Sequence, residues 1–129
     1  MRLIIFEHEG YELLYPLTYL RATFELRCGH TTLGEKICRE TCYTTETAYC
    51  VREILAPIIK QRFPGSKVND PLMFKGENLL LVDGRVLALD KLPVPENDGI
   101  ILHGDSPVIA RISADKAKKL PADTIANFL

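Results

Sequence analysis

Hydrophobic residues along the chain gather in short runs that are separated by turn-forming residues. Residues 2–6 (RLIIF) form an apolar, β-rich run, which predicts a buried strand of the parallel type. Residues 79–82 (LLLV) carry the strongest strand signal and lead into an Asp-Gly turn pair. Residues 99–112 predict a hairpin that turns at 104–107 (GDSP). A short strand is also expected at 48–51.

Helical patterns occupy three further segments. Residues 32–35 (TLGE) match a capping box, which predicts a helix that continues to about residue 42. Residues 52–63 carry apolar side chains at the spacing of an amphipathic helix, with an internal proline that predicts a kink or a late start. A serine at the start of residues 113–120 can cap a last helix, and a proline follows it. A short strand is expected at 66–69.

Strands that alternate with helices and end in a hairpin predict an α/β fold. We expect a mostly parallel Rossmann-like sheet with helices on both faces and an antiparallel hairpin. The 129 residues suit a single domain. Ligands of such sheets lie beyond the carboxyl ends of the strands. The loop after residues 2–6 and the turn after residues 79–82 both open at that edge, so we interpret them together.

The first loop is unusually long for a compact domain. It extends from Glu7 to about Thr31, whereas most connections span about four to six residues. Loops of this length are either disordered or hold a ligand. The leucines and the phenylalanine within it offer a buried anchor and argue against disorder. We therefore expect a binding loop.

Composition narrows the class of protein. Apolar residues make up 47% and charged residues 26%, which is ordinary for a globular domain. The formal charge of −1 does not suggest the clustered basic excess of a nucleic-acid-binding protein. The apolar run near the N-terminus is too short for a signal peptide or a membrane span. We expect a cytoplasmic protein that binds neither nucleic acid nor membrane.

The chain contains four cysteines, Cys28, Cys38, Cys42 and Cys50. Cys38 and Cys42 are four positions apart, a spacing that places both on one face of a helix and could chelate a metal. Zinc sites usually have tighter pairs, such as C-x2-C. In a reducing compartment free cysteines behave as small hydrophobic residues of the core. We favour that interpretation over a metal or disulfide role.

Three segments, in order, are similar to one known family. Residues 13–36 (LLYPLTYLRATFELRCGHTTLGEK) resemble the opening signature of a probable sugar nucleotidyltransferase family, which typically reads LLPLTFTRPxAELRxGILTxxEKW. Residues 62–70 (RFPGSKVND) and 79–87 (LLLVDGRVL) resemble its next segments, the latter usually with Asn-Gly-Arg or Asn-Ala-Arg at the turn. The match covers most of residues 3–112. It implies a nucleotidyltransferase-like fold for residues 1–129, as the N-terminal part of a longer domain.

The resemblance also implies substrates and partners. Enzymes of the wider superfamily join a sugar 1-phosphate to the nucleoside monophosphate unit of a nucleoside triphosphate and release pyrophosphate, with Mg²⁺ as the implied cofactor. Full-length relatives often continue into a left-handed β-helix that resembles acyltransferases, through which a homo-oligomer could form. The superfamily wraps the triphosphate in a glycine-rich loop, and residues 10–18 are a distorted echo of it. Gly10 and Thr18 are thus candidate nucleotide-binding residues.

The echo lacks the second glycine and the arginine of the superfamily loop, which leaves fewer backbone N–H groups near a phosphate. Nucleotidyl transfer depends on cations that position phosphates and offset charge. Arg21 and Arg27 are the candidate catalytic residues because a guanidinium binds phosphate through two parallel hydrogen bonds. Lys36 could add a point charge for nucleotide binding. The alternative is that all three lie on solvated surface or pair with Glu25 and Glu35.

Asp83 is the candidate metal ligand because Mg²⁺ prefers one or two carboxylates with phosphate oxygens and water. In the superfamily a Gly-Asp at a strand end has this role, whereas the family usually has asparagine there. The alternative is a plain turn residue, and Asp105 in Gly-Asp at 104–105 is a second choice. We expect the guanidinium groups of Arg21 and Arg27 to converge with Asp83 around one anionic pocket.

Two functions remain open from the sequence. The first is the nucleotide-facing portion of a sugar-1-phosphate nucleotidyltransferase, and the second is a non-catalytic binding or assembly domain that keeps the fold. The loop around Arg21 and Arg27 with Asp83 motivates the first, and the incomplete glycine-rich loop and the short chain are the reasons to consider the second as its alternative. The 129 residues alone are expected to be inactive, since the sugar-binding half usually follows in sequence.

Overall fold

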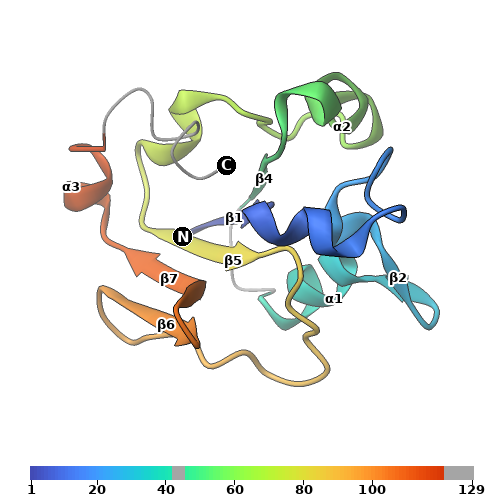
Figure 1. The fold of residues 1–129 in the computed structure, drawn as a ribbon. Helices are drawn as coiled ribbons and strands as arrows, with labels where there is room; N and C mark the ends of the chain where they lie inside the picture. The colour runs from blue at the N-terminus through green and yellow to red at the C-terminus, as the bar shows by residue number, and fades with distance from the viewer. Residues whose placement is uncertain (42–45, 121–129) are drawn as a thin grey trace.

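The computed structural model describes residues 1–41 and 46–120, and its centre is a five-stranded sheet (Figure 1). The strand β1 (Arg2–Phe6) lies between β4 (Thr47–Cys50) and β5 (Leu79–Asp83) and is parallel to both. The hairpin of β6 (Gly99–His103) and β7 (Ser106–Ile112) extends the sheet beyond β5 in antiparallel fashion. The predicted α/β class with a parallel core and an antiparallel hairpin is confirmed.

Helical segments cover both faces of the sheet. They are α1 (Leu33–Glu40), α2 (Ala56–Arg62), α3 (Ala114–Ala117) and the 3₁₀ segments Glu9–Leu14, Thr23–Glu25, Glu53–Leu55 and Pro71–Phe74. One core cluster packs α1 and α2 against one face, and a second packs α3 and the segment Pro71–Phe74 against the other. Within the described ranges, no helix is long and apolar enough to span a membrane.

Several element boundaries differ from the sequence-based expectation. The helix expected at 52–63 starts late. A 3₁₀ segment comes first and α2 begins only at Ala56, because Pro57 fits only near the start of a helix. The strand expected at 66–69 reduces to one bridge between Val68 and Tyr49. The last helix is shorter than expected, and the Ser113 hydroxyl donates to Asp98 instead of capping it. Residue 42 and the proline after residue 120 lie outside the described residues.

The long first loop is folded. Besides its two 3₁₀ segments it contains a two-stranded hairpin of β2 (Arg27–Cys28) and β3 (Thr31–Thr32). The predicted capping box is present at the start of α1, where the Thr32 hydroxyl accepts from the Glu35 backbone N–H at 3.1 Å. The apolar anchor expected for this loop is present only in part. Phe24 is 1% exposed and stacks on Tyr49 of β4, whereas Leu13 and Leu17 are 86% and 64% exposed.

Strand register brings the carboxyl ends of β4, β1 and β5 together. Phe6 at the end of β1 pairs with Cys50 on one side and Asp83 on the other. The Phe6 carbonyl accepts from the Gly84 backbone N–H at 2.8 Å, and the Glu7 backbone N–H donates to the Cys50 carbonyl at 2.8 Å. Because the three parallel strands end together, the first loop and the turn after β5 begin side by side.

Candidate functional site

A buried ion pair fixes the start of the first loop. Glu7 directly follows β1 and its side chain is fully buried, with one carboxylate oxygen 2.6 Å from Nε of Arg52. The second oxygen accepts the Thr23 backbone N–H at 3.0 Å. Arg52 lies just past β4, so the pair joins the ends of two neighbouring strands to the middle of the loop. A buried charge of this kind is stable only while it is paired.

Arg52 also holds the backbone of the loop. Its Nη2 donates to the carbonyl of Thr18 at 2.5 Å and to that of Arg21 at 3.0 Å. Its guanidinium lies 4.1 Å from the ring centre of Tyr11, a cation–π contact. The Thr18 side chain is fully buried and its hydroxyl donates to the Tyr11 carbonyl at 2.7 Å. Thr18 therefore fixes the shape of the loop from within.

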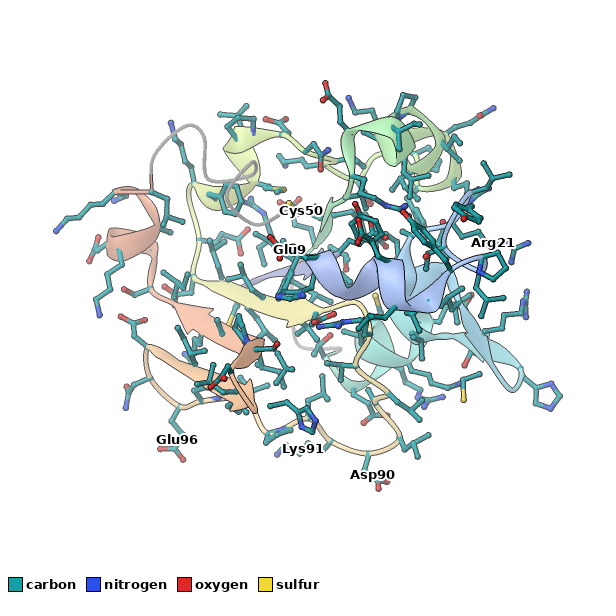
Figure 2. The ribbon with its side chains drawn as sticks, in the orientation of Figure 1. Glu9, Arg21, Cys50, Asp90, Lys91 and Glu96 are labelled. Carbon is teal, nitrogen blue, oxygen red and sulfur yellow. The ribbon has the colours of Figure 1, made fainter. Side chains whose placement is uncertain are left out.

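The two candidate catalytic arginines lie together. Arg21 and Arg27 line a surface depression of about 310 Å³, with Arg62 from the end of α2 and the carboxylates Glu25 and Glu35. Figure 2 shows Arg21 at the outer edge of the molecule, on the side that carries α2. Three guanidinium groups against two carboxylates leave the depression with an excess of positive charge, which suits an anionic ligand.

The arginines of the depression differ in their partners. Arg62 pairs with Glu25 at 2.5 Å, and Arg27 donates to the His30 carbonyl at 3.0 Å. Within residues 1–41 and 46–120, the guanidinium of Arg21 has no hydrogen-bond or ion-pair partner. Glu25 also accepts the Ala22 backbone N–H at 2.9 Å. Arg21 and Arg27 therefore do not pair with the neighbouring glutamates, but both are exposed, which agrees with the alternative of a solvated surface.

Lys36 lies apart from the depression. It is 7% exposed, and its ammonium group donates to the hydroxyl of Thr31 in β3. The contact joins α1 to the small hairpin that carries Arg27. Lys36 thus helps to hold the small hairpin in place against α1.

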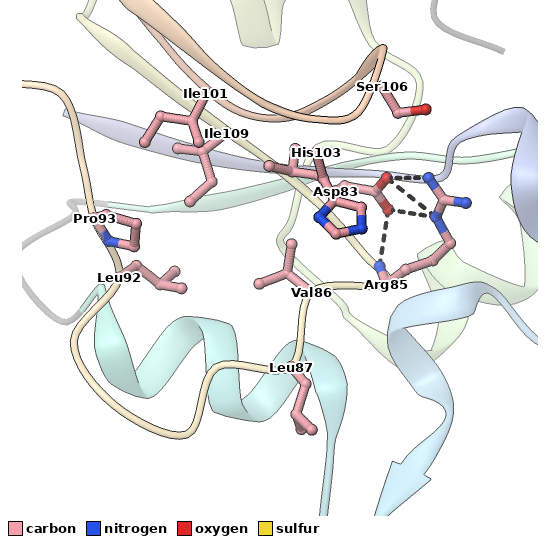
Figure 3. A pocket seen from close by; sticks show the side chains of 11 residues that line it. Asp83, Arg85, Val86, Leu87, Leu92, Pro93, Ile101, His103, Ser106 and Ile109 are labelled. Atoms are coloured by element: carbon pink, nitrogen blue, oxygen red, sulfur yellow. Dashed lines mark hydrogen bonds and ion pairs between the residues drawn. The ribbon is translucent and has the colours of Figure 1, made fainter.

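Asp83 forms a second polar centre at the end of β5 (Figure 3). It is 1% exposed and accepts from the Arg85 side chain, whose Nη2 lies 2.7 Å and Nε 3.1 Å from Oδ2. The Arg85 backbone N–H donates to Oδ1 at 2.9 Å. Hydrogen bonding to Asp83 raises the pKa of the Arg85 guanidinium. The carboxylate and the guanidinium therefore form a tight charged pair around the turn at Gly84.

Gly10 completes this centre from the first loop. A Cβ atom placed on Gly10 would come within 1.9 Å of Nη1 of Arg85. Gly10 thus leaves room for the Arg85 guanidinium, which packs directly against the backbone of the loop. The backbone N–H of Gly10 is itself occupied, because it donates to Nδ1 of His8 at 3.2 Å.

A cavity of about 570 Å³ opens beside Asp83 and Arg85. Its wall is mostly apolar and comes from the turn after β5, the following loop and the β6–β7 hairpin, and Figure 3 shows the side chains around it. Its lining residues beyond that pair are Val86, Leu87, Leu92, Pro93, Ile101, His103, Ser106, Val108 and Ile109. An apolar wall with a few polar groups at one end is typical of a small-molecule site.

The expected convergence of Arg21, Arg27 and Asp83 on one pocket is wrong. The two arginines line the depression, whereas Asp83 lines the cavity, and the two share no lining residue. The reason is the strand order, because β5 and β4 lie on opposite sides of β1. Arg52 follows β4 and draws the part of the loop around Arg21 toward that side.

The described residues offer no preformed metal cage. No group of three His, Cys, Asp or Glu side chains gathers within 1–41 and 46–120. Both oxygens of Asp83 already accept hydrogen bonds from Arg85. Asp83 in this conformation does not fit a resident Mg²⁺, and its role as metal ligand stays a prediction.

The cysteines that the structure describes are free thiols. Cys28 is exposed, and Cys38 and Cys50 lie wholly or partly inside. Burial raises the pKa of Cys38, and it raises the pKa of Cys50 to about 12. These properties agree with Cys38 and Cys50 as small hydrophobic residues of the core. The exposed Cys28 does not fit that interpretation, and Cys42 lies outside the described residues.

Comparison with known proteins places the chain in a family. The family model described as "Sugar nucleotidyl transferase" matches residues 3–127. The chain therefore belongs to the sugar nucleotidyl transferase family, as its resemblance predicted. No curated protein matches the chain.

Three charged residues of these centres were missed from the sequence. Arg85 stands in the segment that carries the resemblance, and its place two residues after a predicted strand end was a usable signal. Glu7 likewise follows a predicted strand directly. Arg52 had no local signal, because its partner Glu7 is 45 residues away in the chain.

Proposed function

We propose that this chain forms the nucleotide-facing portion of a sugar-1-phosphate nucleotidyltransferase. The enzyme would join a sugar 1-phosphate to a nucleoside triphosphate and release pyrophosphate. The observation that carries the proposal is the depression around Arg21 and Arg27, in a chain that belongs to the sugar nucleotidyl transferase family. Mg²⁺ enters this proposal as part of the substrate, bound to the triphosphate.

The chemistry needs positioned charge more than covalent help. An oxygen of the sugar phosphate attacks the α-phosphorus, and the bond from that phosphorus to the pyrophosphate oxygen breaks. The attacking oxygen is already ionised, so no general base is required. Arg21 and Arg27 would hold phosphate oxygens and offset the charge that develops on the departing pyrophosphate. Arg21 suits this role because its guanidinium has no partner among the described residues.

The other candidates would act through the shape of the loop. Thr18 holds the loop backbone through its hydroxyl, and Lys36 supports the hairpin that carries Arg27. Gly10 leaves room for Arg85. We propose these three as nucleotide-binding residues in that indirect sense.

The test is calorimetric titration of the 129-residue chain with each of four nucleoside triphosphates and Mg²⁺. A double variant, Arg21→Ala with Arg27→Ala, should bind the preferred nucleotide at least about tenfold more weakly, since hydrogen bonds to charged groups contribute roughly 1.5–3 kcal/mol each. Arg39→Ala is the matched control because Arg39 is exposed and its ion pair among the described residues is with its neighbour Glu40. Equal affinity of the double variant and the wild type would contradict the proposal.

One observation favours the second function, a binding or assembly domain without catalysis. The candidate metal ligand Asp83 is bound by Arg85 and stands apart from the arginine depression. Titrations distinguish the two, because a domain that has lost the loop chemistry should show no Mg²⁺-dependent nucleotide binding. Pyrophosphate release from a nucleoside triphosphate and glucose 1-phosphate is expected to be near blank for this chain alone.

A further inference from the structure

Arg85 combines features that a purely structural arginine does not need. Its guanidinium joins three parts of the molecule, namely the end of β5, the first loop at Gly10 and the wall of the cavity. Its side chain is 28% exposed, whereas its partner Asp83 is 1% exposed. Arg85 therefore stands between a buried carboxylate and a cavity that opens to solvent.

We propose that Arg85 binds a phosphate group of a ligand in the 570 Å³ cavity, and that Asp83 is the resident counter-ion which this phosphate replaces. The proposal deepens the proposed function, because it rests on a phosphorylated substrate. It assigns the phosphate to Arg85, at a centre separate from the depression at Arg21 and Arg27.

The cavity suits an organic phosphate in both size and chemistry. Its volume of about 570 Å³ lies within the range of about 300–1,000 Å³ that small-molecule sites occupy. The apolar wall can contact a sugar or base ring, and the polar groups gather at the end where Arg85 lies. His103 of β6 and Ser106 of β7 line the same cavity as Asp83 and Arg85 (Figure 3). The phosphate could come from a nucleotide or from a sugar 1-phosphate.

The exchange of one anion for another follows from the geometry of Arg85. A guanidinium can bind a carboxylate or a phosphate through two parallel N–H groups. Asp83 occupies Nε and Nη2 of Arg85, and Nη1 lies against Gly10, so a phosphate that binds through two parallel N–H groups competes with Asp83. The phosphate carries the greater negative charge. Asp83 would keep the backbone N–H of Arg85 at 2.9 Å after the guanidinium turns away. This retained donor lowers the cost of leaving a buried carboxylate without its cation.

If Asp83 and the phosphate compete for Arg85, the two substitutions should change phosphate affinity in opposite directions. In Asp83→Asn the resident anion is gone while Arg85 remains, so phosphate ligands should bind about fivefold to tenfold more tightly. In Arg85→Gln the cation is gone, and binding should weaken about tenfold or more. The probes are ATP, glucose 1-phosphate and inorganic phosphate, titrated by calorimetry in EDTA so that no divalent ion contributes. Arg39→Gln serves as the control and should bind as the wild type does.

Three outcomes would overturn the proposal. The first is equal binding of every probe by Arg85→Gln and the wild type, and the second is weaker binding by Asp83→Asn in EDTA. The third is failure of both the wild type and Asp83→Asn to bind any probe. Thermal melts check that each variant folds, and Arg85→Lys replaces Arg85→Gln if the latter does not. The lysine variant should bind more weakly than the wild type because it loses the two-pronged contact.

Titration with the separate probes also identifies the source of the phosphate, and it distinguishes failure of this proposal from failure of the proposed function. A loss confined to glucose 1-phosphate in Arg85→Gln assigns the site to the sugar phosphate, and a loss confined to ATP assigns it to the nucleotide. The double variant of Arg21 and Arg27, titrated in Mg²⁺, tests the depression independently. If the double variant of Arg21 and Arg27 binds nucleotide weakly while Arg85→Gln binds as the wild type does, only the inference about Arg85 is overturned.

Discussion

Gly10 of the first loop lies directly against the Arg85 side chain of the turn after β5. Gly10 lies in a 3₁₀ segment and has ordinary helical backbone angles, so alanine itself would cause no backbone strain there. The added methyl group would instead collide with the Arg85 guanidinium, the flexible end of a long side chain. The cost of the substitution therefore depends on whether Arg85 is present.

We predict a strong coupling between these two positions. Gly10→Ala should lower the free energy of unfolding by about 1 kcal/mol in the wild type, because Arg85 must leave its place beside Asp83. In the Arg85→Ala background the same change should be almost neutral or slightly stabilising. Urea denaturation of the four proteins of this cycle measures the coupling. An equal cost of Gly10→Ala in both backgrounds would show that Arg85 does not lie against the loop.

At the scale of elements, the first loop is held to the sheet by charge as well as by apolar packing. Glu7 extends β1, and Arg52 extends β4. Their ion pair lies beneath the 3₁₀ segments that form the loop. Replacing one partner leaves the other charge buried without compensation, which is the costly way to break such a pair. The loop and the sheet edge should therefore lose stability together.

Glu7→Gln is predicted to lower the free energy of unfolding by about 3 kcal/mol. The glutamine keeps the shape of the side chain but carries no charge to balance Arg52. Glu12→Gln is the matched control, because Glu12 is exposed in the same loop and should change stability by less than about 0.5 kcal/mol. Guanidinium chloride denaturation gives both values. A change as small as that of the control would mean that Glu7 is not paired in the buried state.

Elements whose cause is local could be predicted from the sequence. The strands β1 and β5 were predicted because both of their faces are buried, so their apolar runs are almost unbroken. The cap of α1 was predicted because Thr32 and Glu35 satisfy each other's backbone within one turn. The prediction of a strand at 66–69 was wrong, since the ladder there is a single bridge between Val68 and Tyr49 of β4.

Parts of the site whose cause is tertiary could not be predicted in the same way. The pairing of Arg21 and Arg27 in one depression follows from their closeness in sequence. Their separation from Asp83 depends on the order of strands around β1, which no local pattern encodes. The engagement of Asp83 by Arg85 depends on a side-chain rotamer and on the room that Gly10 provides. A motif thus indicated which residues matter, but not which of them meet.

At the scale of the whole molecule, the first loop connects two charged centres that lie on opposite sides of β1. One is the depression with Arg21 and Arg27, and the other is the pair of Arg85 and Asp83 beside the cavity. Ligand binding at either centre should stabilise the loop, the strand ends and the core beneath them. Cys50 in β4 reports on that core, because it is 1% exposed and pairs in register with Phe6 at the end of β1.

Alkylation of Cys50 is therefore predicted to require unfolding of the sheet. Burial raises the pKa of its thiol to about 12, so the reactive thiolate is nearly absent in the folded protein at pH 8. Iodoacetamide should modify Cys28, which is exposed on the small hairpin, at the rate of a free thiol. Cys50 should react slower by orders of magnitude, at the rate set by unfolding. Peptide mass spectrometry reads each cysteine separately.

The nucleotide that binds best in the titrations should slow this reaction further. A ligand that binds only the folded state at 100 times its dissociation constant stabilises it by about 2.7 kcal/mol, which corresponds to roughly a hundredfold slower alkylation of Cys50. Cys28 serves as the internal control, because its exposed thiol should react at the same rate with and without the nucleotide. Cys50 reacting as fast as Cys28 would mean that β4 is not part of a closed core. Equal protection with and without the nucleotide would mean that its binding is not coupled to the folding of the sheet edge.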